Sequence, residues 1–217
     1  MYTHKRRTVG FTLVEILIAS AVLSLFTFFG YKVFIAMSRS FQKGSWALAT
    51  QNKLRNGLHF VREEMQKATY RTDVTLGGTV ISDVGFQLRL AAGDTITSGD
   101  IAHWYICLPF VSGDADSPGA IFKCELKLEN GALIISKGKE QGDDPLNKER
   151  LLNNYKIIDN VEEVRLTHEP FDPDNERMGS MITMELLVRH HDRDHFPEAQ
   201  IIDRTGAKVE VEVVRDL

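Results

Sequence analysis

The chain has 217 residues, of which 43% are hydrophobic and 26% charged, and its formal net charge is −4. These ordinary globular values exclude a wholly disordered chain, a collagen-like repeat and a polytopic membrane protein. The acidic balance argues against a nucleic-acid binder that works through bulk positive charge. Two cysteines exclude a disulfide-dense mini-protein and a four-cysteine zinc site, and the length allows one domain or at most two.

The N-terminal part combines a basic leader with an apolar helix. Three basic residues lie in the first ten: Lys5, Arg6 and Arg7. The following run from Phe11 to Tyr31 carries one charge, that of Glu15. About 21 helical residues span roughly 30 Å, the thickness of a bilayer core. Lys32 ends the run, where its ammonium can reach the lipid headgroups. The basic flank predicts a cytoplasmic N-terminus and an exported remainder.

Glu15 is the unusual residue of this segment, because a carboxylate inside an apolar helix costs free energy in lipid. Two interpretations remain open. Glu15 lies at the membrane interface, or it pairs with a positive group in an assembly. No small-residue cleavage site follows the apolar run. Gly10 lies before it, and a cut there would create an amine on Phe11 as such a partner.

The order of basic leader, glycine, phenylalanine, glutamate and apolar helix resembles the class III signal of type IV pilins and pseudopilins. Gly10, Phe11 and Glu15 match that pattern, and the resemblance covers about 30 residues. It implies that a prepilin peptidase cuts after Gly10 and methylates Phe11, and that Glu15 helps to dock the subunit into a filament. It also implies other pilins as partners through the N-terminal helix, and an inner-membrane location before incorporation into a pilus or pseudopilus.

The absence of proline from the middle of the apolar helix departs from major type IV pilins and favours a pseudopilin or minor pilin. Short runs that begin at Gly30, Leu54 and Arg62 are similar to J-type minor pseudopilins of type II secretion and to W-type minor pilins. We therefore expect a subunit that initiates or caps assembly. A pilus-associated adhesion or DNA-uptake subunit is the alternative. No catalytic residue, cofactor, metal or nucleic-acid partner is expected. Membrane lipid is expected as a partner.

Apolar residues recur at helical spacing beyond Lys32, and we expect the helix to end near 71–73. They form one stripe: Phe34, Met37, Phe41, Leu48, Leu54, Leu58, Val61, Met65 and Ala68. The stripe packs either on the protein's own sheet or on neighbouring helices, and Glu64 is assigned to the opposite, polar face. Gly44 and Gly57 allow bends. The expected parts are a leader 1–10, an apolar helix 11–37, an amphipathic helix 38–73 and a head 74–217.

The rest of the chain alternates apolar and polar residues, which predicts strands. Alternation is clearest at 122–128, 182–188 and 209–213, and Asn130-Gly131 predicts a hairpin turn into 132–135. Further candidate strands are 79–90, 102–110 and 155–166. A long helix packed on an antiparallel sheet with one buried face gives an α+β fold.

Three groups of reactive residue types lie in this region. If the connection after Pro109 turns about Ala115-Asp116, Cys107 and Cys124 face each other, and an oxidising compartment then favours a disulfide over two buried thiols. The segment 190–195 contains three histidines but fits no metal spacing, so a solvated turn is the better interpretation. The acidic runs at 114–116 and 172–176 are interpreted as acidic turns, with calcium loops as the alternative.

Overall fold

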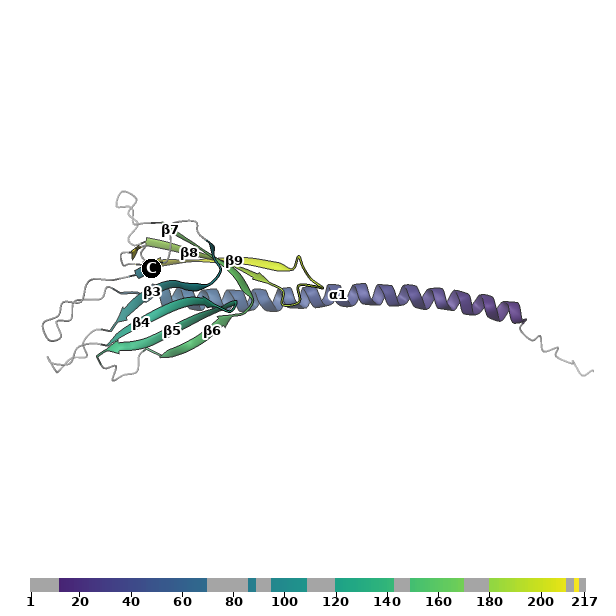
Figure 1. Ribbon diagram of the computed structural model, residues 1–217, viewed down its shortest axis with the longest axis horizontal. Helices are drawn as coiled ribbons and strands as arrows, with labels where there is room; N and C mark the ends of the chain where they lie inside the picture. The colour runs from purple at the N-terminus through teal and green to yellow at the C-terminus, as the bar shows by residue number, and fades with distance from the viewer. Residues whose placement is uncertain are drawn as a thin grey trace, which may run out of the picture. The chain divides into compact units, whose positions relative to one another are not determined.

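The computed structural model describes residues 12–69, 86–88, 95–108, 120–142, 149–169, 180–209 and 213–214. One helix, α1 (Leu13–Gln66), is followed by strands in two sheets (Figure 1). The chain divides into two compact units, Met1–Trp46 and Ala47–Leu217. The architecture is the α+β class that the sequence predicts.

The larger sheet has the strand order β10-β1-β3-β4-β5-β6. Its strands are β1 (Phe86–Leu88), β3 (Gly99–Cys107), β4 (Ile121–Glu129), β5 (Ala132–Gln141), β6 (Leu152–Ile158) and β10 (Val213–Val214). Neighbours are antiparallel except β1 and β10, which are parallel. The β4–β5 hairpin turns at Asn130 and Gly131, both with positive φ, as the Asn-Gly pair predicts.

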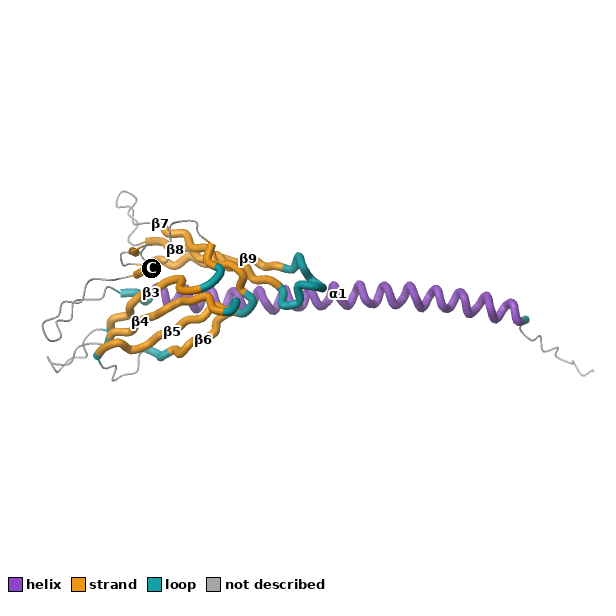
Figure 2. Tube along the Cα trace, in the orientation of Figure 1, coloured by secondary structure: helices purple, strands orange, loops and turns teal. Residues whose placement is uncertain are grey.

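The smaller sheet has the order β2-β7-β8-β9 and is antiparallel throughout. Its strands are β2 (Thr95–Ile96), β7 (Val161–Glu169), β8 (Ser180–Arg189) and β9 (Gln200–Val209). Figure 2 shows the strands of both sheets in orange. The expected single strand at 155–166 is wrong, because the chain turns at Asn160, whose φ is 57°, and so separates β6 from β7.

One hydrophobic core joins the later part of α1 to both sheets. Leu54 and Val61 of α1 are fully buried, together with Trp104 of β3, Leu133 of β5 and Leu186 of β8. The part of the stripe from Leu54 to Ala68 is therefore covered by the protein's own sheets, which confirms the first of the two interpretations for that part.

The helix ends at Gln66, earlier than the expected 71–73. Thr69 explains this end. Its backbone N–H donates to the carbonyl of Tyr105 at 2.8 Å, and its hydroxyl accepts from the N–H of Cys107 at 2.7 Å. Because Thr69 hydrogen-bonds the edge of β3, the chain has already left the helix when it reaches the sheet.

Candidate functional site

The first part of α1 carries the largest exposed apolar surface in the described chain. The helix contains a stretch near its N-terminus that is long and apolar enough to cross a membrane, and no residue of that stretch is buried. The exposed large side chains of this unit are Leu13, Val14, Ile16, Leu17, Ile18, Val22, Leu23, Leu25, Phe26, Phe28, Phe29, Tyr31, Val33, Phe34, Met37 and Phe41. Lipid or other helices must cover such a surface in an aqueous cell.

Hydroxyl groups in this segment are bonded within the helix. Ser24 Oγ donates to the carbonyl of Ser20, and Thr27 Oγ1 donates to the carbonyl of Leu23, both at 2.8 Å. Ser20 Oγ donates to the carbonyl of Leu17 at 2.9 Å. These bonds satisfy the hydroxyl protons without water, as a lipid environment requires.

Glu15 closes a capping box at the start of α1. One of its carboxylate oxygens, Oε2, accepts from the Thr12 backbone N–H at 2.8 Å and from the Thr12 hydroxyl at 2.9 Å. The Thr12 hydroxyl accepts in turn from the Glu15 N–H at 3.3 Å. Thr-x-x-Glu at a helix start is the sequence signature of this motif. The carboxylate therefore stabilises its own helix terminus, a role that sequence reasoning missed although the spacing predicts it.

Lys32 lies at the end of the apolar run, as expected from the sequence. Its ammonium nitrogen is 5.5 Å from the centre of the Phe28 ring, one turn earlier in the helix. The side chain thus leans toward the N-terminus, as helical side chains do. The other residues expected at the processing site and the basic flank lie outside the described residues: Lys5, Arg6, Arg7, Gly10 and Phe11.

The predicted apolar stripe of α1 has two different environments. Leu54, Leu58, Val61 and Met65 are buried against the sheets. By contrast, Phe34, Met37, Phe41 and Leu48 are 66–76% exposed. Packing on the protein's own sheet is therefore wrong for Leu48, and the expected contact of the earlier part of the stripe with neighbouring helices stays a prediction.

A buried ion cluster fixes the later part of α1 to β5. Lys137 Nζ of β5 contacts Glu64 Oε2 at 2.6 Å and Glu149 Oε2 at 2.7 Å. Lys67 Nζ contacts the other Glu64 oxygen at 2.8 Å. Only 2% of the Lys137 side chain and 7% of the Glu64 side chain are exposed. The assignment of Glu64 to the polar face is wrong, because its partner lies 73 residues away in the sequence.

Burial is the strongest single influence on the pKa of Glu64 and raises it, but the hydrogen bonds from Lys137 and Lys67 together lower the pKa below its ordinary value. Glu64 is therefore ionised at neutral pH. Two lysines and two carboxylates give a cluster without net charge, which holds the helix in one register on the sheet. A cavity of about 210 Å³ borders it, lined in part by Phe60 and Tyr155.

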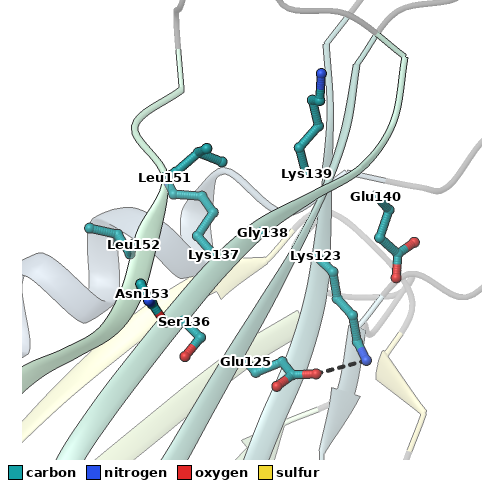
Figure 3. Close-up of a pocket in the computed structure, with 10 residues that line it drawn as sticks. All are labelled: Lys123, Glu125, Ser136, Lys137, Gly138, Lys139, Glu140, Leu151, Leu152 and Asn153. Carbon is teal, nitrogen blue, oxygen red and sulfur yellow. Dashed lines mark ion pairs between the residues drawn. The ribbon is translucent and has the colours of Figure 1, made fainter.

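A second hollow, of about 500 Å³, lies over β4, β5 and the start of β6 (Figure 3). Its lining includes Lys123 and Glu125, whose ion pair of 2.8 Å is drawn there. Gly138 lies in the floor, where an added Cβ would meet no atom within 4 Å. The hydroxyl of Ser136 donates to the amide oxygen of Asn154 at 2.9 Å, and a neutral amide is not a general base.

The expected disulfide is wrong, because both cysteines are free. The strand register explains the difference: Cys107 is opposite Ile121, and Cys124 is opposite Trp104. The cysteines are three positions apart along the ladder, and an odd number of positions puts them on opposite faces of the sheet. Burial raises the pKa of the Cys124 thiol to about 12, which leaves it unreactive.

The histidine-rich segment is a turn between β8 and β9, as the sequence predicts, but His190 is buried in it. The His190 ring stacks on His191 at 4.3 Å, and His195 contacts Asp192 at 3.0 Å. Among the residues that the structure describes, no group of three His, Cys, Asp or Glu could hold a metal ion. The acidic runs 114–116 and 172–176 lie outside those residues.

Comparison with known proteins adds no relative to these observations. No family model, no curated protein and no solved structure matches the chain. Its function is therefore inferred from its own residues and their geometry.

Proposed function

We propose that this chain is a minor pilin-like subunit that initiates or caps the assembly of a type II secretion pseudopilus or a type IV pilus. The observation that carries the proposal is the exposed apolar part of α1, from Leu13 to Phe41, which begins directly after the Gly10-Phe11 signal. In this proposal a prepilin peptidase cuts after Gly10, and the apolar helix stays in the inner membrane with the head on the outer side.

The physical role of the exposed segment is to exchange one apolar environment for another. Lipid chains cover it in the membrane, and the helices of other subunits replace the lipid on assembly through close packing and dispersion. The ion cluster and the hydrophobic core fix the later part of α1 in the head. The head therefore travels with its helix as one subunit.

Glu15 has two roles in this proposal that can be separated. In the single chain it caps the helix through Thr12. In the assembly its charge pairs with the amine of a neighbouring Phe11. Glutamine at this position retains the capping hydrogen bonds but not the charge, since a capping box accepts either residue. Thr12→Ala weakens the cap and retains the charge.

The first test of the proposal is the mass and N-terminal sequence of the protein from its native membrane. N-methylated Phe11 at the N-terminus is the expected result, and an intact Met1 or a cut beyond Tyr31 would overturn the proposal. The second test compares filament incorporation of Glu15→Gln and Thr12→Ala. Charge pairing predicts that Glu15→Gln is no longer incorporated into the filament and that Thr12→Ala still is. The opposite pattern would reduce Glu15 to a helix cap.

A further inference from the structure

The basic side chains of α1 are distributed unusually. No acidic residue lies between Glu15 and Glu63, yet six basic residues do: Lys32, Arg39, Lys43, Lys53, Arg55 and Arg62. Lys32, Arg39 and Lys43 belong to the first unit and are exposed. At about 100° of rotation per residue, these three fall within an arc of about 40° on the helix. They form a basic stripe that follows the apolar span directly.

The basic stripe lies opposite the apolar one. Phe34, Met37 and Phe41 fall within an arc of about 60° centred on the other side of the helix. All three are exposed. The segment thus presents its cations on one side of the helix and these three large apolar side chains on the other.

No carboxylate of the described residues forms an ion pair with this stripe. In the head, by contrast, many basic side chains pair with carboxylates: Lys67, Lys123, Lys127, Lys137, Lys156, Arg165, Arg189 and Arg193. Lys32 contacts the Phe28 ring, which is not an anion. Any counter-charge for the stripe therefore comes from outside the described residues.

We infer that Lys32, Arg39 and Lys43 form a binding surface for the phosphate groups of anionic phospholipids on the head side of the membrane. The inference rests on the membrane-spanning part of the proposed function. Lys32 stands at the end of the apolar span, and its ammonium leans back toward that span. The Cα of Arg39 lies about 10 Å farther along the axis, and that of Lys43 about 16 Å. Headgroups extend about 5–8 Å beyond the hydrocarbon core.

These heights predict a graded response. Lys32 lies at headgroup level. The guanidinium of Arg39 reaches down toward the headgroups, because helical side chains point toward the N-terminus. The Cα of Lys43 lies about 8–11 Å beyond the headgroups, which is about one Debye length at physiological salt, so Lys43 acts mainly through a screened field. A basic residue near an anionic surface strengthens binding about fivefold, so Lys32 and Arg39 dominate.

The experiment uses the full chain extracted from membranes that contain anionic and zwitterionic phospholipids. Mass spectrometry measures the ratio of the two lipid classes retained by the protein. The test variant is K32Q/R39Q/K43Q, and the matched control, K53Q/R55Q/R62Q, removes the same charge from exposed positions in the head-packed part of α1. A second control, K32R/R39K/K43R, keeps the charge.

We expect the wild type and both controls to retain a several-fold excess of anionic lipid, and K32Q/R39Q/K43Q to return to the bulk ratio. Lys32→Gln alone should reduce the excess most and Lys43→Gln least. Equal ratios in wild type and K32Q/R39Q/K43Q would overturn the inference. The inference would also be overturned if K32Q/R39Q/K43Q kept the wild-type lipid ratio but lost its crosslinks to an acidic neighbouring subunit. The basic stripe would then bind a protein and not lipid. Release of the chain by alkaline carbonate would instead disprove membrane insertion and with it the proposed function.

Discussion

The two parts of α1 belong to one continuous helix but meet different surroundings. From Leu13 to Phe41 most large apolar side chains are exposed, and Lys32, Arg39 and Lys43 form no ion pair with a carboxylate of the described residues. From Leu54 to Gln66 the apolar side chains lie in the core, and even a glutamate is buried in ion pairs. The same helical periodicity thus accompanies an exposed apolar surface in the first part and core packing in the second. Apolar spacing alone therefore does not tell whether a stripe is exposed or buried in the core.

The largest expected effect is on the ion cluster of the second part. Lys137→Met leaves Glu64 and Glu149 to Lys67 alone, and removal of one partner from a buried pair costs about 3–5 kcal/mol of unfolding free energy. The loss of unfolding free energy is measured by denaturing the full chain in detergent, with the fluorescence of the buried Trp104 as the readout. Lys127→Met is the control: Lys127 is 37% exposed, and its loss should cost less than about 1 kcal/mol.

The effect of Lys137→Met should depend on pH. The lysines hold the pKa of Glu64 below its ordinary value, so their stabilisation is present above the unfolded pKa near 4.3. It is lost as the pH falls through the lower, folded pKa, because Glu64 then takes up a proton. The difference between Lys137→Met and wild type should therefore shrink below about pH 4. A difference that stays constant down to pH 2 would contradict the role of Glu64.

A pair of identical substitutions tests the two parts of the stripe directly. Leu54 is fully buried and Leu48 is 66% exposed, only six positions earlier. Leu54→Ala should lower the unfolding free energy of the head by about 2–5 kcal/mol, because it leaves a cavity in the core. Leu48→Ala should leave that stability within about 0.5 kcal/mol of wild type. Equal losses in the two variants would mean that the head also covers Leu48.

A pair of glycines gives the smallest expected effects. A Cβ at Gly57 would lie 2.8 Å from side-chain atoms of Ile157 and Ile158, whereas one at Gly44 would meet nothing within 4 Å. Gly57→Ala should therefore destabilise the head by about 1–3 kcal/mol through overpacking. Gly44→Ala should increase helix stability by about 1 kcal/mol, which far-ultraviolet circular dichroism during heating can follow. Stabilisation by Gly57→Ala would show that the isoleucines move aside.

The sequence predicts those features that depend on neighbours in the chain. Helical spacing locates α1, and Asn130-Gly131 locates a hairpin, because local backbone preferences decide both. The apolar run likewise predicts the part of α1 that is long and apolar enough to cross a membrane. The bend that Gly57 allows stays a prediction. The helix continues through this residue, and its lack of a side chain admits Ile157 and Ile158.

Long-range pairing accounts for what the sequence did not predict. Glu64 is buried only because Lys137 reaches it across 73 positions, and no local pattern contains that information. The cysteine pairing fails because the register of β3 and β4 places Cys107 opposite Ile121. The strand β9 lacks a clear alternation, since Asp203 and Thr205 occupy inward positions at the sheet edge that are only half-buried.

The contact of Gly57 with Ile157 and Ile158 has a mechanical consequence when it is taken together with Glu64. The two contacts lie seven residues, or about 10 Å, apart on the helix axis. The close approach at Gly57 resists rotation, since the next residues would bring side chains into the same space. The ion pairs at Glu64 resist sliding. A pull on the later part of α1 is therefore passed to β5 and β6, the two neighbouring strands that carry Lys137 and the two isoleucines.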